Sequence, residues 1–371
     1  MGTRTRRPVV GQPGEPFEGV EQIAVLRGGG LGDLLFALPA VTALAETYPD
    51  AEITLLGTPM HAALLSDRPG PVTSVEVLPV SEGVRAGGPE DPLAREEFMA
   101  RMQSRRLDLA VQVHGGGRFS NPFLLELGAR HTVGTRTPDA APLERNLAYV
   151  YYQHEVLRAL EVVGLAGAVP VDLEPYVELT EPERAGRAEA RRDGRAPLLL
   201  IHPGATDPRR RWPAEAFGDV AAAVAGDGTE VLVIGDESDV AAAGAIVDRA
   251  RRLSPGATVC SVAGQVQLGE LVGLLARGTV LLANDSGPRH LAQAVGTATV
   301  GVYWFGNVIN AQPFSRARHR IHMSWTTRCP VCGRDCTQVG WRAERCEHDD
   351  SFVADVAVED VLADVCELLG R

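Results

Sequence analysis

The sequence predicts an α/β protein built from two Rossmann-like domains that face a central cleft. Three observations support this prediction. Short apolar runs repeatedly lead into glycine-containing turns and then into segments with helical periodicity, which is the pattern of βα units. The 371 residues exceed what one hydrophobic core usually serves. Residues 164–183 contain three prolines and separate two series of βα units, so they are the expected linker.

The first domain is expected over residues 21–175. It follows residues 1–20, which are rich in proline and glycine and show no periodicity, so we interpret them as a disordered tail. Residues 81–92 are rich in glycine and charge and are expected to form a mobile surface loop. Strands are expected at residues 23–26, 52–56, 75–78 and 107–113, and a long helix at residues 146–163.

The first strand runs into a glycine-rich turn, residues 27–33, that ends in Asp33. A dinucleotide fingerprint requires its last glycine where this chain has Asp33, and a carboxylate there would face the pyrophosphate. A nicotinamide cofactor is therefore not expected. Asp33 either caps the helix that follows or acts as a base at the rim of a cleft, where the glycines let a substrate approach the backbone. The sequence leaves both interpretations open.

A second glycine loop, His114 to Arg118, follows the expected strand at residues 107–113. Ligands of open parallel sheets bind outside the carboxyl ends of the strands. This loop is therefore expected to line the same cleft as Asp33, with His114 as a candidate site residue. His114 is equally compatible with a loop histidine that has no role.

The second domain is expected over residues 176–371. His202 closes its first strand before Pro203 and Gly204, and we expect this histidine to be structural because such residues usually satisfy local backbone groups. Pro213 suits the first turn of the next helix. Strands are expected at residues 198–201, 231–234, 258–262, 279–283 and 298–303, and a helix at residues 240–251.

The turn from Asn284 to His290 lies between an apolar run and an amphipathic segment. This pattern predicts a strand, a tight loop and the start of a helix. Backbone N–H groups at a helix start lack internal partners and favour an anion, and a phosphate is the natural candidate. The alternative is that Asp285 or Ser286 merely caps the helix.

Composition restricts the partners. The net charge of −12 argues against a nucleic-acid binder, because neutralising phosphates supplies most of that affinity. All 36 basic residues are arginine, so any cationic role in a site falls to arginine or histidine. No apolar run is long enough for a transmembrane segment or a secretory signal, and a cytoplasmic protein is expected.

Three motifs in order give the chain a family resemblance. They are Gly30-Leu31-Gly32-Asp33 with Leu38-Pro39-Ala40, His202-Pro203-Gly204 with Arg211-Trp212-Pro213, and Asn284-Asp285-Ser286-Gly287 with His290. Over residues 22–365 the chain resembles glycosyltransferase family 9, the heptosyltransferase group with the two-domain GT-B architecture. The resemblance implies transfer of a sugar from a nucleotide diphosphate donor to an acceptor hydroxyl with inversion, and no catalytic cofactor.

The resemblance also implies roles for individual residues. Asp33 matches the proposed catalytic base, and Arg210 stands where relatives place a lysine that contacts the donor diphosphate. Glu237 resembles an acidic residue near the nucleoside. Arg289 replaces a smaller residue, so it either adds a diphosphate contact or indicates a donor other than ADP-heptose. The expected donor-binding residues are Gly32, Thr206, Glu237, Asp285, Ser286, Gly287 and His290.

The sequence thus predicts an inverting glycosyltransferase, with a heptose from ADP-heptose as one candidate sugar. The second domain is expected to bind the donor, and the first to receive the acceptor near Asp33 and His114. A glycan, a metabolite and a protein are all open as acceptors. Two alternatives are a nucleotide-sugar epimerase on the same fold and a non-catalytic nucleotide-sugar-binding or scaffold protein.

Cys329, Cys332, Cys336 and Cys346 form a C-x2-C-x3-C-x9-C cluster. Thiolates this close together in a cytosolic chain favour a tetrahedral zinc or iron site, although free or disulfide-forming thiols are the alternative. The cluster also resembles a four-cysteine iron site in the C-terminal region of some protein-modifying relatives. Because it lies away from the three motifs in sequence, we expect a structural role.

Overall fold

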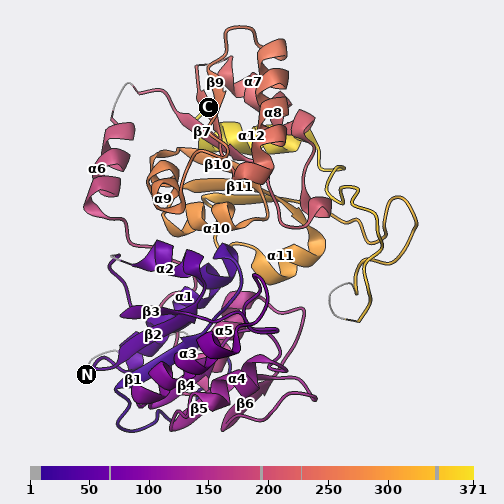
Figure 1. Cartoon of the computed structure of the whole chain (residues 1–371). Helices are drawn as coiled ribbons and strands as arrows, with labels where there is room; N and C mark the ends of the chain where they lie inside the picture. The colour runs from indigo at the N-terminus through magenta and orange to yellow at the C-terminus, as the bar shows by residue number, and fades with distance from the viewer. Residues whose placement is uncertain (1–9, 67, 193–194, 227, 339–341) are drawn as a thin grey trace, which may run out of the picture. The chain divides into compact units, whose positions relative to one another are not determined.

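The computed structural model describes residues 10–66, 68–192, 195–226, 228–338 and 342–371. The chain divides into two compact units, Met1–Glu178 and Leu179–Arg371. Each unit contains a six-stranded parallel sheet with helices packed on it (Figure 1). The predicted pair of Rossmann-like units is therefore confirmed.

The first sheet has the strand order β3-β2-β1-β4-β5-β6. The chain first winds from β1 toward β3 and then restarts at β4 on the other side of β1. The register places Leu26 of β1 opposite Leu56 of β2 and Gln112 of β4. The strands are β1 Gln22–Leu26, β2 Glu52–Gly57, β3 Ser74–Val77, β4 Leu109–Gln112, β5 His131–Arg136 and β6 Arg145–Ala148.

Helix α1 Leu31–Thr47 is the central helix of the first unit, and it packs against α5 Glu155–Gly164. Its apolar side chains, Leu34, Leu35 and Leu44 among them, are fully buried, so α1 is fixed over the end of β1. The remaining helices are α2 Pro59–Leu65, α3 Pro92–Ser104 and α4 Ser120–Glu126.

The second sheet has the order β12-β11-β10-β7-β8-β9. Here β10 lies beside β7, so the chain reverses its winding direction between these two strands. Such a reversal point is where open α/β sheets usually bind ligands. The strands are β7 Leu198–His202, β8 Glu230–Val233, β9 Val259–Ser261, β10 Val280–Asn284, β11 Ala298–Trp304 and β12 His319–Ser324.

Helix α7 of the second unit packs against both α8 and α12, and α9 contacts both α6 and α10 (Figure 1). A continuous core of buried Val, Leu, Ile and Ala side chains joins the first three helices to the sheet. The helices are α6 Glu181–Ala190, α7 Ala214–Ala225, α8 Val240–Leu253, α9 Leu268–Arg277, α10 Gly287–Ala294, α11 Phe305–Ala311 and α12 Val358–Leu368, with short 3-10 turns at Pro208–Arg210 and Glu237–Asp239.

Two regions differ from the prediction. The long helix expected at residues 146–163 is wrong, because Arg145–Ala148 forms β6 and α5 begins only at Glu155. Residues 10–20, expected in the disordered tail, instead pack on the first unit. Phe17 and Val20 are buried, and the Phe17 ring stacks on His131. Residues 1–9 of that expected tail lie outside the described residues.

The loop at residues 81–92, which was expected to be mobile, carries an isolated antiparallel bridge between Ser81 and Arg85. Its Val84 side chain is buried. None of the helices within the described residues combines the length and the apolar composition needed to cross a membrane.

Candidate functional site

Asp33 lies in the first turn of α1, and both of its carboxylate oxygens have partners. Oδ2 accepts a hydrogen bond from the Gly30 N–H at 2.8 Å, and Oδ1 accepts one from Arg27 Nη2 at 2.5 Å. Gly30 is the N-cap, and Asp33 completes a capping box. The Asp33 side chain is nevertheless 46% exposed. The carboxylate is therefore fixed by the helix start and still accessible to a ligand.

Arg27 follows β1, and its side chain is only 7% exposed. Nε donates to the Asp33 carbonyl at 2.9 Å, Nη1 donates to the Val113 carbonyl at 2.5 Å, and Nη2 lies 3.5 Å from Glu155 Oε2. Glu155 also pairs with Arg158 on the next turn of α5. One buried guanidinium thus joins the Asp33 loop to the end of β4 and to α5, with charge-assisted bonds that hold its direction.

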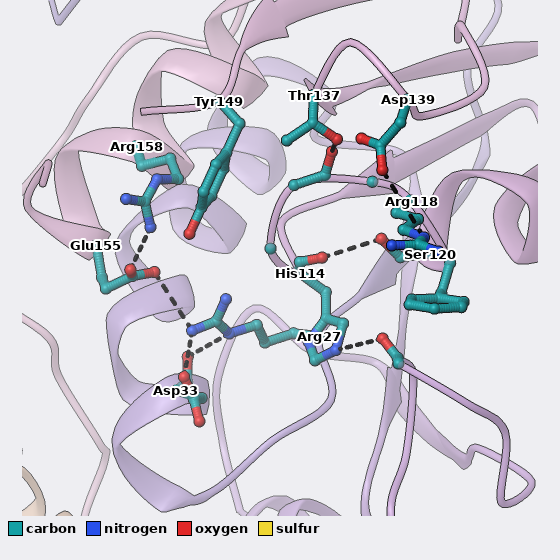
Figure 2. A pocket seen from close by; sticks show the side chains of 15 residues that line it. Arg27, Asp33, His114, Arg118, Ser120, Thr137, Asp139, Tyr149, Glu155 and Arg158 are labelled. Carbon is teal, nitrogen blue, oxygen red and sulfur yellow. Dashed lines mark hydrogen bonds and ion pairs between the residues drawn. The ribbon is translucent and has the colours of Figure 1, made fainter. Parts of the chain in front are cut away.

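These side chains line a pocket of about 470 Å³ in the first unit. In Figure 2, Arg27 lies between Asp33 and the pocket interior, and the Tyr149 ring points into the same space. Arg118 and Asp139 form an ion pair at 3.7 Å, and both are largely exposed. The lining therefore combines carboxylates, guanidinium groups and hydroxyls, which suits a polar ligand with several hydroxyl groups.

His114 belongs to the wall of this pocket, as expected from its place after β4. Its Nε2 lies 3.1 Å from the Gly83 carbonyl, so this nitrogen carries a proton and donates. Burial, followed by the positive charge of Arg27, lowers the pKa of His114, which favours the neutral ring. The neutral ring holds the 81–92 loop against the pocket.

The glycine-rich turn before Asp33 is held in place by close packing. A Cβ at Gly28 would lie 2.2 Å from the Val84 carbonyl, so only glycine fits there. His61 Nδ1 accepts from the Thr58 N–H at 3.2 Å, which leaves Nε2 to donate to the Gly30 carbonyl at 3.2 Å. The turn that carries Asp33 is therefore rigid on both sides.

In the second unit, the buried carboxylate of Asp285 contacts three side chains. Oδ1 lies 2.9 Å from His290 Nε2, and Oδ2 accepts from Asn307 Nδ2 at 2.7 Å and from Arg210 Nη1 at 3.2 Å. Burial opposes the charge, but the hydrogen bond from His290 and the positive charge of Arg210 outweigh it and lower the pKa of Asp285. The structure thus brings together three of the predicted site residues, Asp285, His290 and Arg210.

Arg289 is fully buried, at 0% exposed, which argues against a diphosphate contact, one of the two interpretations of this position. Its Nη1 donates to Gln293 Oε1 at 2.9 Å and to His290 Nδ1 at 3.2 Å, and its Nη2 donates to Thr299 Oγ1 at 3.2 Å. Because arginine only donates, Nδ1 of His290 carries no proton. Nε2 of His290 is therefore the nitrogen that donates to Asp285.

Asn284 closes β10 and fastens the loop that follows β7. Its Oδ1 accepts from the Trp212 N–H at 2.9 Å, and its Nδ2 donates to the Pro203 carbonyl at 2.6 Å. Both amide groups are used, and the side chain is 0% exposed. This clamp brings the segment that contains Arg210 to the end of β10.

His202, which was expected to be purely structural, contacts a predicted donor-binding residue. Its Nδ1 lies 3.1 Å from Ser286 Oγ, and its Nε2 lies 3.4 Å from Asp239 Oδ2. The Ser286 hydroxyl is therefore directed by a buried His–Asp pair at the reversal point of the sheet. The side chains of Asp285 and Ser286 are thus engaged elsewhere than in capping α10.

The other predicted donor-binding residues lie at turns. Thr206 and Glu237 are exposed in the segments that follow β7 and β8. Glu237 lies beside Gly264, where an added Cβ would come within 2.8 Å of its Oε2. Gly287 is the first residue of α10, whereas Gly32 belongs to the first unit, next to Asp33.

The cysteine-rich segment gathers three of the four predicted metal ligands. The ligand atoms of Cys329, Cys332, Cys346 and His348 lie within 4.8 Å of one another. His348 takes the place expected for Cys336, whose thiol donates to the Arg334 carbonyl at 3.4 Å. The group of ligand atoms that could hold a metal thus contains three of the four predicted cysteines and one histidine.

This donor set fits a metal ion. Three thiolates and one imidazole are a common tetrahedral ligand set, and Zn–S bonds near 2.3 Å would place the sulfurs about 3.8 Å apart. The Nδ1 atom of His348 is buried and has no hydrogen-bond partner among the described residues. All six cysteines are free thiols, so no disulfide competes for these side chains.

Comparison with known proteins shows to which family the chain belongs. Residues 98–337, more than half of the chain, match the sequence profile of glycosyltransferase family 9 (heptosyltransferase). The chain belongs to glycosyltransferase family 9. The predicted family and the predicted enzyme class, glycosyltransferase, are thereby confirmed.

Three similar proteins illustrate this membership. The lipopolysaccharide core heptosyltransferase OpsX of Haemophilus influenzae is 22% identical over 362 residues, which are 95% of this chain and 98% of OpsX. The crystal structure of the glycosyl transferase family 9 from Veillonella parvula has a TM-score of 0.73 at 19% identity, covering 94% and 97% of the two chains. TibC of enterotoxigenic E. coli, an iron-containing dodecameric heptosyltransferase in complex with ADP-D-β-D-heptose, has a TM-score of 0.54 at 13% identity, covering 95% and 77%. The structures confirm the GT-B fold.

Several residues of this family 9 member were missed by sequence reasoning. Arg27 was visible as a charged residue between a buried strand and a glycine loop, and Asn307 lies in the first turn of α11, the helix that follows β11. Both residues could have been named as site candidates from the sequence. His348 also carried a signal, because it stands two residues after Cys346, whereas Glu155 carried none, because only the fold brings it to Arg27.

Proposed function

We propose that this glycosyltransferase moves a heptose from ADP-heptose to an acceptor hydroxyl with inversion at the anomeric carbon. The names of the similar proteins support the sugar, since OpsX is a heptosyltransferase and TibC was crystallised with ADP-D-β-D-heptose. The acceptor is a hydroxyl of a glycan, a metabolite or a protein. No nucleic acid takes part.

The observation that carries this proposal is the half-exposed carboxylate of Asp33, fixed by Arg27 and Gly30 at the edge of the 470 Å³ pocket. As a general base, Asp33 removes the proton of the acceptor hydroxyl as its oxygen attacks the anomeric carbon. The bond from that carbon to the diphosphate breaks, and ADP leaves with the bonding electrons. A single displacement of this kind inverts configuration.

Glu155 is a second carboxylate in the same pocket, yet it is the poorer candidate for the base. Its side chain is 21% exposed, against 46% for Asp33. Asp33 and Glu155 share the Arg27 guanidinium, but Glu155 also pairs with the second buried guanidinium, Arg158, so it is held by two positive charges. We assign Glu155 the task of holding Arg27, and His114 the task of shaping the acceptor side.

On the donor side, Asp285 anchors Arg210 and does not itself face the donor. Its oxygens are filled by His290, Asn307 and Arg210, so the carboxylate does not repel the diphosphate. Arg210 then offers its remaining N–H groups to the leaving ADP, supported by the start of α10. The other proposed donor contacts are Thr206, Glu237, Ser286 and Gly287.

Cys329, Cys332, Cys346 and His348 are proposed to hold one structural zinc or iron ion. The buried, unpartnered Nδ1 of His348 supports this assignment. The iron in the name of TibC makes iron the first metal to test. The ion supplies cross-links between loop segments, and the transfer reaction uses no metal.

Calorimetric titration of the purified protein with ADP, UDP, GDP and dTDP tests the donor, with bound metal assayed on the same sample. Selective ADP binding is the expected result, and transfer is then tested with ADP-heptose and candidate acceptors. Preference for another nucleotide would reject ADP-heptose as donor. Binding of none of the four would reject the proposed donor site altogether.

A further inference from the structure

The cysteine-rich segment, residues 326–352, contacts the donor-side loop directly although the two are far apart in sequence. The Phe352 N–H donates to the Arg209 carbonyl at 2.7 Å. The Ser351 hydroxyl donates to the Arg211 carbonyl, also at 2.7 Å. These two bonds flank Arg210, the residue whose guanidinium reaches Asp285.

Side chains reinforce this contact. The Arg209 guanidinium lies over the Phe352 ring, 5.1 Å from its centroid, and is paired with Asp207. Phe352 is itself buried with Cys329, Cys336 and Cys346 in a small apolar cluster. Arg209 therefore points away from the donor side and into the cysteine-rich segment, and this leaves Arg210 facing the donor loop.

The backbone of this loop is thus held from two sides. Asn284 holds Trp212 from the end of β10, and the Ser351–Phe352 pair holds the carbonyls of Arg209 and Arg211. The 3-10 turn at Pro208–Arg210 is a single short turn capped by the Asp207 side chain, and the outside contacts fix where it lies relative to β10 and the cysteine-rich segment. A shift of the turn would move Arg210 off Asp285.

We propose that Ser351 and Phe352 are positioning residues for the nucleotide donor, and that the metal cluster keeps them in place. They touch no donor atom and act through Arg210. Donor affinity therefore depends on the Cys329–Cys332–Cys346–His348 cluster. This inference rests on the proposed function, since it requires the donor to bind beside Arg210.

The cluster matters for a physical reason. Residues 326–352 contain no helix or long strand within their described part, and their order relies on a few turns and on the ligand cluster. Bringing Cys329 and His348 together costs conformational entropy. A metal ion bound by both residues offsets this cost and keeps the loop closed. Phe352 lies four residues beyond His348, so a metal bound by His348 also restricts the position of Phe352.

The test measures ADP affinity by calorimetry on the full chain. Phe352→Leu keeps apolar volume and removes the ring that Arg209 covers, and we expect ADP to bind about three- to tenfold more weakly. Phe352→Tyr keeps the ring and should restore affinity. Phe98→Leu is the matched control, because Phe98 is a buried ring of the first unit that also carries an arginine, Arg101.

Metal content and unfolding temperature are measured on the same samples. Phe352→Leu should retain its metal while losing ADP affinity, and Phe98→Leu should lose stability without losing affinity. Cys332→Ser should lose both metal and ADP affinity. If wild-type protein binds ADP and Phe352→Leu and Cys332→Ser bind it equally well, the positioning role is wrong. If wild-type protein binds no ADP, the proposed function itself fails.

Discussion

The substitution Asp33→Asn distinguishes a role of Asp33 in turnover from a role in donor binding or in stability. Asn Oδ1 can still accept from Arg27, and the guanidinium keeps its bonds to the Asp33 and Val113 carbonyls and its pairing with Glu155. The Asn Nδ2 that replaces Oδ2 cannot accept from the Gly30 N–H, so the capping-box hydrogen bond is lost together with the half-exposed ion pair, and we expect a stability loss of about 1–2 kcal/mol. Loss of a general base should lower kcat by about 10²- to 10⁴-fold, or roughly 3–5 kcal/mol in barrier height.

Three measurements on Asp33→Asn check this reasoning. Release of ADP from ADP-heptose is followed with an acceptor that wild-type protein uses. Calorimetry should show unchanged ADP affinity, because the contacts found for Asp33 all lie within the first unit, and thermal unfolding should show a small shift. A kcat within about threefold of wild type would refute the role of the base. Loss of ADP binding would place Asp33 in the donor site instead.

Three further predictions concern the second unit. Arg210→Ala should weaken ADP binding about ten- to hundredfold through loss of charge-assisted bonds, and Arg210→Lys should recover part of it; unchanged calorimetric affinity would contradict this. Cys332→Ser should lose metal and stability by elemental analysis and thermal unfolding, whereas Cys336→Ser should keep its metal; equal loss in both would reject His348 as the fourth ligand. Burial, reinforced by Arg289 and Arg318, lowers the pKa of His319 to about 3. The pKa of His319 is lower in the folded than in the unfolded protein, so the unfolded protein takes up the proton first as the pH falls. The free energy of unfolding is therefore highest above about pH 6.5 and is about 2 kcal/mol lower at pH 5. His319→Gln should flatten this dependence in urea titrations, and a slope equal to wild type would show that His319 does not titrate as described.

The central strands of both sheets were predictable because each is buried on both faces. Strands β1, β4, β7 and β10 are continuous apolar runs, and each leads into a polar or glycine turn that carries a candidate site residue. The topology rule for parallel sheets then placed His114 near Asp33, and the structure lines one pocket with both.

Three strands were missed. Strand β5 lies between β4 and β6 and is mostly buried, but its sequence, HTVGTR, contains no continuous apolar run. Strands β6 and β12 lie at the edges of their sheets, and most of their residues are only partly buried. Their sequences, RNLA and HRIHMS, are correspondingly polar. An edge strand is specified by its neighbour's hydrogen bonds more than by its own apolar pattern, so sequence periodicity carries little signal there.

Contacts between distant residues explain the remaining site errors. Spacing pointed to Cys336 as the fourth ligand, whereas the structure groups His348 with the ligand atoms of the other three cysteines and has the Cys336 thiol donate to the Arg334 carbonyl. For Arg289, a diphosphate contact was one of two interpretations. A helix position next to a site residue faces a different direction, and here that direction is the core.

The burial of Arg289 has a practical consequence for mutational work on the donor loop. Its hydrogen-bond acceptors Gln293, Thr299 and His290 are neutral, and its Nε is unpartnered within the described residues. Asp285 is the buried carboxylate that balances both this charge and that of Arg210. Replacing Asp285 would leave the buried Arg289 without this carboxylate and would release the partly exposed Arg210 from its partner. Loss of activity in such a variant would report misfolding before it reported anything about the nucleotide.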